Sequence, residues 1–347
     1  MVGIIGLGNE GFALYSYLAN HKIPLVAYTT NPTNLSIKRI NSRGKVEGSF
    51  ELNVSQDLRE ILKQEIIFIT TVTTVYEDIA NKIVQVREID LSKKMFVLFS
   101  GKLGGVLVFN KILKNNGINT TIVETDAIFA ARKIYDDTVW IRGIKKWNLM
   151  ITNLDYWGSN KSLEVYDIVR ELLPDINLEI ADNFIQRGLN DFGAMAHATI
   201  SLVNLSNIDS KRDMLFYIDG VTENTVILID KVYQEFNQVA KKFSTYVLHP
   251  IELLDRYYGT DKTNLYRAIK GVSNYKYTRM PDSIHNRFLY EDVLNTLFPL
   301  TLLAKTVNVE VPICQSIVNI MCSLLSIDPF VKGRTLQKMG LEELPKV

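Results

Sequence analysis

Short runs of apolar residues alternate with helical patterns through the first half of the chain. We expect strands at six of these runs, which are Val2–Ile5, Ile23–Tyr28, Glu65–Thr71, Met95–Phe99, Thr121–Glu124 and Trp147–Ile151. Between several of them, apolar residues recur at helical spacing, in Glu10–Asn20, Ser55–Lys63, Val75–Val86 and Gly104–Asn115. This alternation is typical of a doubly wound, mainly parallel sheet that is covered by helices on both faces.

The second half of the chain is predicted to be helical. From about Asp182 onward, apolar residues recur every three or four positions, and strand patterns are scarce. Further helices are expected at Val221–Lys242, Pro250–Tyr258, Glu291–Val307 and Pro312–Ser326. A chain of 347 residues exceeds what one core usually supports. We therefore predict two domains, an α/β domain over residues 1–182 and an all-α domain over residues 183–347.

A glycine-rich turn follows the first predicted strand. Gly6, Gly8 and Gly11 form a G-x-G-x-x-G pattern that opens the first predicted helix, which is the setting that the dinucleotide-binding fingerprint of a Rossmann domain requires. Gly6 permits the tight turn, Gly8 lets the backbone approach a pyrophosphate, and Gly11 lets the helix pack close to the sheet. The helix N-terminus then offers N–H groups and a positive dipole end to the phosphates. A glycine turn without a ligand is the alternative.

The residues after the second strand predict which dinucleotide is bound. NAD sites usually place Asp or Glu there, about 20 residues after the glycine loop, to accept from the ribose 2′-OH. This chain has Thr29 and Thr30 instead, followed by Lys38 and Arg39, and cations suit a 2′-phosphate. We therefore favour NADP(H) over NAD(H), with a solvated helix face as the alternative for the two basic residues. The candidate cofactor-binding residues are Gly6, Gly8, Asn9, Glu10, Gly11, Thr29, Thr30 and Arg39.

A second glycine-rich turn, Phe99–Gly105, follows a predicted strand and precedes a predicted helix. Such turns lie at the carboxyl edge of the sheet, where ligands bind in this class of fold. Lys102 in this turn could therefore contact a phosphate or a substrate. A purely structural turn fits the pattern equally well.

His197 is the histidine that the pattern singles out among the four in the chain. Around it, a stripe of small and polar residues runs beside an apolar stripe. The polar stripe holds Asn190, Gly193, His197, Ser201 and Asn204, and the apolar stripe holds Leu189, Phe192, Ala196, Ile200 and Val203. Small neighbours leave space above the ring, as a general acid or base that faces a cleft needs. A hydrogen-bonded core histidine fits the pattern as well.

Arg287 and Asp292 bracket an aromatic run just before a long apolar helix. Asp292 is a candidate carboxylate partner for His197, and Arg287 could hold a carboxylate substrate through two parallel hydrogen bonds. The alternatives are structural. Asp292 would then cap the helix that begins at Val293, and Arg287 would form a surface ion pair.

These segments, in this order, resemble the opine dehydrogenases, also called the octopine/nopaline dehydrogenase family. The resemblance covers essentially the full length of the chain. It rests on Gly6–Gly11, Val123–Thr125 with Ala131 and Arg132, the His197 helix with Leu202–Asn204, Phe216–Thr222, Arg287–Asp292 and Gly333–Leu336. It implies an N-terminal Rossmann domain that is joined to an all-helical C-terminal domain.

The resemblance also implies a reductive condensation. Members of the family join the amine of an amino acid to the carbonyl of an α-keto acid, often pyruvate, and reduce the imine with NAD(P)H. The catalytic histidine of the family falls on His197, its aspartate partner on Asp292, and the arginine that holds the keto-acid carboxylate on Arg287. Ala198 stands where many members have a proline, so we expect the helix to continue past His197.

Two other functions remain open from the sequence. A 2-keto acid or ketopantoate-type reductase would use the same histidine to protonate an alkoxide. A non-catalytic NADP(H)-binding sensor would need only the dinucleotide site, although the presence of all three proposed site residues argues against it.

Composition and charge narrow the expected partners and compartment. The chain has 39 Lys and Arg against 38 Asp and Glu, and a net charge of +1 does not favour nucleic acid as a partner. No apolar run reaches the roughly 18 residues of a membrane span, and the first strand begins too early for a cleaved signal. We expect small-molecule substrates, no membrane partner, no bound metal and a cytoplasmic location, with a homodimer as one option.

The two cysteines, Cys314 and Cys322, lie in one predicted helix. Their spacing corresponds to roughly 12 Å along a helix axis, whereas a disulfide needs Cα atoms within about 7 Å. We therefore expect two buried thiols, as in a reducing compartment.

Overall fold

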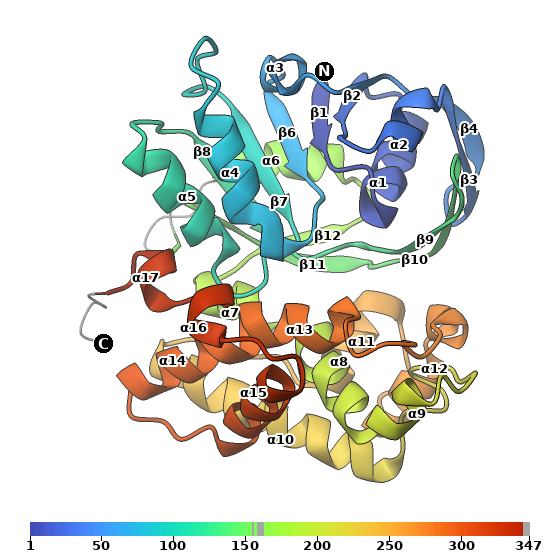
Figure 1. Ribbon diagram of the computed structural model, residues 1–347, viewed down its shortest axis with the longest axis vertical. Coiled ribbons are helices and arrows are strands. Elements are labelled where there is room, and N and C mark those ends of the chain that lie inside the picture. Colours follow the sequence, from blue (N-terminus) through green and yellow to red (C-terminus); the bar gives the residue numbers. More distant parts are fainter. Residues whose placement is uncertain (155, 158–162, 343–347) are drawn as a thin grey trace. The chain divides into compact units, whose positions relative to one another are not determined.

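The computed structural model describes residues 1–154, 156–157 and 163–342, and it divides into two compact units (Figure 1). The first unit comprises Met1–Gly101 with Gly105–Ile180, and the second comprises Lys102–Gly104 with Ala181–Val347. The division after Ile180 lies two residues before the boundary that we expect from the sequence. The residues Lys102–Gly104 lie within the N-terminal part of the sequence but are grouped with the second unit.

A large sheet forms the centre of the first unit. Its eight strands lie in the order β12-β11-β8-β7-β6-β1-β2-β5, and all pairs are parallel except β11 with β8. The strands are β1 (Val2–Ile5), β2 (Leu25–Tyr28), β5 (Val54–Ser55), β6 (Ile66–Ile69), β7 (Met95–Phe99), β8 (Thr121–Thr125), β11 (Trp147–Thr152) and β12 (Asn177–Ile180). The six predicted strands are confirmed, whereas β5 and β12 were not predicted.

Helices alternate with these strands, and the topology places the first glycine turn at a ligand-binding position. The helices are α1 (Asn9–Asn20), α2 (Pro32–Ser36), α3 (Leu58–Leu62), a 3-10 turn (Thr73–Val75), α4 (Tyr76–Val84), α5 (Gly105–Asn115) and α6 (Leu163–Leu172). Strand β1 pairs with β2 on one side and with β6 on the other, so successive connections leave β1 in opposite directions. Doubly wound sheets bind ligands at such a point, outside the carboxyl ends of the strands.

The turn from β1 into α1 needs glycine at two positions and leaves open space at a third. Gly6 has a positive φ of 106°, and a Cβ on Gly11 would lie 1.9 Å from the Gly6 carbonyl oxygen. Gly8 has ordinary extended backbone, and no heavy atom lies within 4 Å of the position that its Cβ would take. The turn is therefore tightly packed at Gly6 and Gly11 and open beside Gly8.

A second, four-stranded sheet in the first unit was not predicted. Its order is β4 (Gly48–Glu51), β3 (Arg39–Gly44), β10 (Thr138–Ile144) and β9 (Phe129–Tyr135). Helix α1 contacts strands of both sheets (Figure 1), so the side chains from Gly11 to Leu18 are all buried. Our alternative of a helix face at Lys38 and Arg39 is wrong, because α2 ends at Ser36 and β3 begins at Arg39.

The second unit is built from helices. They are α7 (Phe184–Leu189), α8 (Phe192–Val203), α9 (Leu205–Asp209), α10 (Glu223–Lys242), α11 (Pro250–Tyr258), α12 (Leu265–Gly271), a 3-10 turn (Ser273–Tyr277), α13 (Arg287–Asp292), a π-helical turn (Val293–Leu297), α14 (Phe298–Thr306), α15 (Pro312–Leu324), α16 (Pro329–Lys332) and α17 (Leu336–Met339). Leu215 and Arg279 form an isolated β-bridge. The predicted combination of an α/β domain and an all-α domain is confirmed.

The helical pattern around His197 is divided into two helices. Asn190 and Asp191 separate α7 from α8. Asp191 is the N-cap of α8, because its carboxylate accepts from the backbone N–H groups of Gly193 (2.8 Å) and Ala194 (3.4 Å). Helix α8 then continues past Ala198 to Val203, as the absence of proline predicts. The predicted faces fail at its end, since Val203 is 50% exposed and Ser201 is fully buried.

A π-helical turn interrupts the long apolar helix that we predicted over Glu291–Val307. Pro299, near the start of α14, has no N–H to donate to the carbonyl of Asn295 four residues earlier. That carbonyl instead accepts from the backbone N–H of Leu103 at 3.1 Å. The wider turn therefore ties the Lys102–Gly104 segment to the helix that carries Asp292.

The cysteines and the apolar helices can be compared with the sequence predictions of free thiols and of no membrane span. Cys314 and Cys322 are buried free thiols, as predicted. Within the described ranges, no single helix is long and apolar enough to cross a membrane, although the bent pair Pro312–Leu324 and Pro329–Met339 passes the same test of length and composition when taken together.

We expect Gly11→Ala to lower the stability of the protein and Gly8→Ala to leave it nearly unchanged. A methyl group on Gly11 meets the Gly6 carbonyl, and forced overpacking of this kind costs about 1–3 kcal/mol. A methyl group on Gly8 meets open space. Thermal melts of the two cofactor-free variants, followed by circular dichroism, measure the difference. Equal melting temperatures for the two variants would contradict the geometry of the turn.

Candidate functional site

The glycine turn of the first unit has the form of a phosphate-binding site. The first hydrogen bond within α1 runs from the N–H of Phe12 to the Gly8 carbonyl at 3.0 Å, and the amides ahead of it are those that helix N-termini offer to phosphates. Asn34 supports the turn by donating to the Leu7 carbonyl at 2.9 Å. Lys133 donates to the Asn34 side chain at 2.9 Å and lies over the ring of Phe12. Burial lowers the pKa of Lys133.

Two of the predicted cofactor-binding side chains also have structural contacts. The side-chain amide oxygen of Asn9 accepts from the backbone N–H of Lys133 at 2.9 Å. The Glu10 carboxylate accepts from the backbone N–H groups of Ile128 (3.2 Å) and Phe129 (3.1 Å). Both side chains therefore join α1 to the chain that enters β9, which is a role that the sequence did not indicate.

The end of β2 carries hydroxyl groups and no carboxylate. Thr29 is buried and its hydroxyl accepts from the backbone N–H of Asn31 at 3.2 Å, whereas Thr30 is exposed. Arg39 is exposed at the start of β3, and it donates to the hydroxyl (3.0 Å) and the carbonyl (2.8 Å) of Ser49. These contacts hold the guanidinium of Arg39 beside β4.

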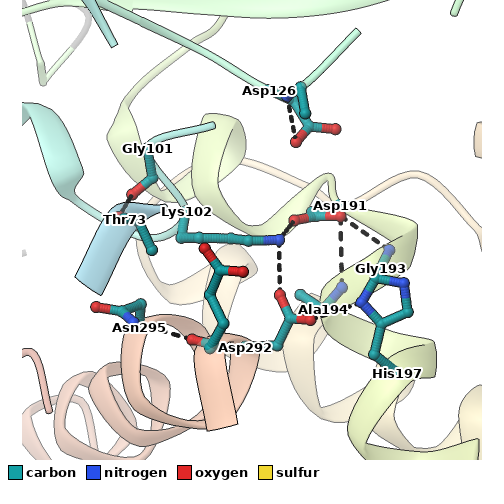
Figure 2. A network of polar contacts seen from close by, with 12 residues as sticks. Thr73, Gly101, Lys102, Asp126, Asp191, Gly193, Ala194, His197, Asp292 and Asn295 are labelled. Carbon is teal, nitrogen blue, oxygen red and sulfur yellow. Dashed lines mark hydrogen bonds and ion pairs between the residues drawn. The ribbon is translucent and has the colours of Figure 1, made fainter. Parts of the chain in front are cut away.

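A buried ion-pair network is formed by residues of the second unit (Figure 2). Nδ1 of His197 is 2.7 Å from Oδ2 of Asp292. The other oxygen of Asp292 is 2.6 Å from Nζ of Lys102, and Nζ is also 2.7 Å from Oδ2 of Asp191. Lys102, Asp191 and Asp292 are each at least nine-tenths buried. The structure therefore brings the predicted His197 and Asp292 together and adds a lysine and a second carboxylate.

Local geometry explains how each group enters the network. Lys102 has a positive φ of 60° in the turn after β7. Asp191 is fixed by capping α8, and Asp292 is the last residue of α13, directly before the π-helical turn. Our alternative that Asp292 caps the following helix is wrong, because no backbone N–H binds its side chain as a cap.

The imidazole of His197 is enclosed more tightly than we predicted. Phe288 stacks on it with ring centroids 4.3 Å apart and an interplanar angle of 15°, so an aromatic ring fills space that we expected to be open. On the other side, a Cβ on Gly193 would lie 2.8 Å from Cε1 of the ring. The outer nitrogen, Nε2, is 2.8 Å from the hydroxyl of Tyr217, which itself stacks on Tyr275.

Electrostatics fix the protonation pattern of the pair. Burial favours the neutral form of Asp292, but Lys102 and His197 outweigh it and hold the pKa of this carboxyl below its usual value. An ionised carboxylate can only accept, so Nδ1 of His197 carries a hydrogen. In the neutral imidazole, Nε2 is then an acceptor for the hydroxyl of Tyr217.

Arg287 lies beside this network and takes no part in its hydrogen bonds. It begins α13 and is exposed, with Nη1 3.7 Å from the carboxylate of Glu291. Its guanidinium lies 5.9 Å from the centroid of the Phe288 ring, the ring that stacks on His197. The predicted surface pair and a position near the imidazole are therefore both present.

Three groups of the network were missed or left open by the sequence. Lys102 was considered for a ligand contact but not for an ion pair with two carboxylates. Asp191 could have been found as a capping residue before an apolar helix, and Tyr217 lies in a segment that carries the family resemblance. Within the described part of the chain, no group of three or more His, Cys, Asp or Glu side chains could hold a metal ion.

A family model, a curated relative and solved structures all show similarity between this chain and opine dehydrogenases. Residues 180–325 match the family described as NAD/NADP octopine/nopaline dehydrogenase, alpha-helical domain. An opine dehydrogenase from Arthrobacter sp. (strain 1C) is 26% identical over 98% of this chain and 95% of its own length.

Two solved structures resemble the whole chain in fold. Octopine dehydrogenase with NADH and L-arginine has a TM-score of 0.78 at 16% identity, and it covers 98% of this chain and 95% of its own. Yersinopine dehydrogenase with bound NADP+ has a TM-score of 0.73 at 12% identity, with 98% and 96% covered. The helical-domain match, the full-length relative and the shared fold each relate this chain to the opine dehydrogenases.

Proposed function

We propose that this protein catalyses the reductive condensation of an amino acid with an α-keto acid such as pyruvate. The products are an N-(carboxyalkyl) amino acid, water and the oxidised dinucleotide. The observation that carries the proposal is the contact between Nδ1 of His197 and Asp292 at 2.7 Å, formed between residues that are far apart in the sequence. A histidine that is oriented by a buried carboxylate is the arrangement of a general acid and base.

His197 moves the protons of the condensation. The free amine attacks the keto carbonyl, and the resulting carbinolamine loses its hydroxyl as water after that oxygen gains a proton. The imidazolium of His197 supplies this proton, and Asp292 stabilises the imidazolium through Nδ1–H. The carboxylate remains ionised throughout, because Lys102 and His197 both favour its charged form.

Tyr217 stands between the reacting groups and the imidazole in this scheme. Its hydroxyl occupies Nε2 of His197 at 2.8 Å, the only ring nitrogen that Asp292 does not hold. A hydroxyl can receive a proton on oxygen while it releases its own proton to a neighbour. We therefore assign to Tyr217 the transfer of protons between the substrate and Nε2.

Arg287 holds the carboxylate of the keto acid. Its exposed guanidinium has a fork of donors that matches a carboxylate, and its ion pair with Glu291, at 3.7 Å, is long. A carboxylate in this position would lie one aromatic ring away from His197.

The first unit fits a dinucleotide at the β1–α1 turn. Gly8 offers open space to a pyrophosphate, and the start of α1 offers backbone amides. The bound dinucleotide supplies the hydride that reduces the imine carbon. Thr30 and the cation of Arg39 at the adjoining strand ends favour NADP(H), since no carboxylate there would repel a 2′-phosphate.

We expect oxidation of the reduced dinucleotide to require both pyruvate and an amino acid, and His197→Ala to lower kcat by about 10²–10⁴-fold. The loss follows from removing the general acid and base. The assay follows the near-ultraviolet absorbance of NADPH with pyruvate, with and without a pool of amino acids. His285→Ala, an exposed histidine, serves as the matched control.

The same assay separates the other functions. Turnover with pyruvate alone would identify a 2-keto acid reductase. No turnover with either dinucleotide, over a wider set of keto acids and amines, would favour a binding protein.

We expect Arg287→Lys to raise the KM for the keto acid by about tenfold to a hundredfold, with a smaller effect on the KM for the amine. Lysine keeps the charge but loses the two parallel hydrogen bonds, and a hydrogen bond to a charged group contributes about 1.5–3 kcal/mol. Steady-state kinetics with each substrate varied in turn measure both constants. The exposed Arg279 provides the matched change, Arg279→Lys. An unchanged keto-acid KM in Arg287→Lys would remove this residue from the site.

We expect Thr30→Asp to shift the preference from NADPH toward NADH by at least about tenfold in the ratio of kcat/KM values. The new carboxylate would repel a 2′-phosphate and accept from a ribose 2′-OH, a charge-assisted contact of about 1.5–3 kcal/mol. Thr263→Asp, an exposed position in the helical unit, controls for the added charge. A wild-type enzyme that already prefers NADH would contradict the assignment of NADP(H).

A further inference from the structure

Asp191 is a buried charge that the proposed reaction does not use, and Lys102 enters that reaction only by keeping Asp292 ionised. Lys102 lies 2.6 Å from Asp292 and 2.7 Å from Asp191, and neither carboxylate is more than 2% exposed. Burying three charges carries a large desolvation cost unless they are mutually paired. One cation between two anions leaves one negative charge in excess, and the group that can cancel it is the imidazole of His197, 2.7 Å from Asp292.

The charge of the network therefore depends on the protonation of His197. With neutral imidazole, Lys102, Asp191 and Asp292 sum to one negative charge. With imidazolium, the network is neutral. A lysine paired with Asp292 alone would already be neutral, and a protonated His197 would then add an uncompensated positive charge.

We propose that Lys102 and Asp191 are positioning residues that set the proton affinity of His197 from opposite directions. Lys102 keeps Asp292 ionised and disfavours the imidazolium. Asp191 offsets the charge of Lys102 and so favours the imidazolium. Together, the two residues allow His197 both to take up and to release a proton. Only the use of this proton in catalysis rests on the proposed function.

Asp191 is close enough to act directly as well as through Lys102. A Cβ on Gly193 would meet Oδ1 of Asp191 at 3.1 Å and Nδ1 of His197 at 3.2 Å, so the carboxylate and the ring border the same small space. Figure 2 shows the Lys102 amine between the two carboxylates, with His197 beside them on α8.

Other titratable groups also lie around the imidazole. Tyr217 binds Nε2, and Tyr275, whose pKa burial raises well above its usual value, stacks behind Tyr217. Glu291 precedes Asp292 and faces Arg287 at 3.7 Å. The tyrosines are neutral in the range where imidazole titrates, and Glu291, a third buried carboxylate, is present in every variant compared below.

The test is a titration of the histidine rings by NMR in protein labelled with 15N-histidine, without substrate or dinucleotide. The chain has four histidines, and a His197→Gln sample assigns the signal. We expect Asp191→Asn to lower the titration midpoint of His197 by about one pH unit or more, and Lys102→Met to raise it by a similar amount, as the loss of a charge at this distance predicts. The double variant should return toward the wild-type midpoint.

The variants differ in how well they preserve the fold. Asparagine also caps helices well, so Asp191→Asn keeps the start of α8. Lys102→Met leaves two buried carboxylates facing each other and can fail to fold. In that event, Asp191→Asn and the double variant still decide the question, because one should lower the midpoint and the other should restore it.

Midpoints within about 0.3 units of the wild type in both Asp191→Asn and the double variant would overturn the proposal, given the shift of about one unit expected from a charge at this distance. A shift of the two single variants in the same direction would overturn it too. Lys262→Met, which breaks the exposed pair with Asp255, should leave the midpoint unchanged. Since the titration needs no turnover, its result stands apart from the assay of the reaction. If that assay succeeds, the acidic limb of the pH profile of kcat/KM should move with the midpoint.

Discussion

The arrangement of the helical unit depends on the contact of one buried ammonium group with two carboxylates. Lys102 comes from a turn, Asp191 from the start of α8 and Asp292 from the end of α13. Each of these charges would be very costly alone in a dry interior. The three segments must therefore meet with their side chains at hydrogen-bonding distance, and His197 on α8 is oriented by the same requirement. Apolar packing around the network, such as Phe288 on the imidazole, contributes stability but cannot specify this geometry.

The parts of the fold that the sequence predicts are those with a strong local pattern. Six of the eight strands of the large sheet are short, mainly apolar runs, and each was found to within two residues at either end. The second sheet was not predicted because its strands carry exposed polar residues, such as Arg39 on β3 and Arg132 on β9, and because its pairings include a register shift. Strands of this kind are defined by their neighbours and not by their own composition.

As with the fold, some residues of the site could be predicted from a local sequence pattern, whereas others are brought together only by the folded chain. Gly6, Gly8 and Gly11 were predicted because their spacing between a strand and a helix is itself the signal. Asp292 was one candidate partner for His197 from the sequence, and the family resemblance selected it, since no pattern within either helix points to the other. Lys102 remained undecided between a ligand contact and a structural role, because its two partners lie 89 and 190 positions further along the chain. Distances of that kind are set only by the folded chain.

The assignment of Lys102–Gly104 to the helical unit has a consequence for how this protein can be divided. The segment is encoded within the Rossmann half, yet its backbone bonds to Asn295 and Arg334 and its lysine neutralises buried charge among the helices. A fragment that begins at Ala181 would contain Asp191 and Asp292 but not their cation. The helical half is thus a structural unit without being a separable one, and gene fusions or domain exchanges that cut at the apparent boundary would remove the counterion of Asp191 and Asp292.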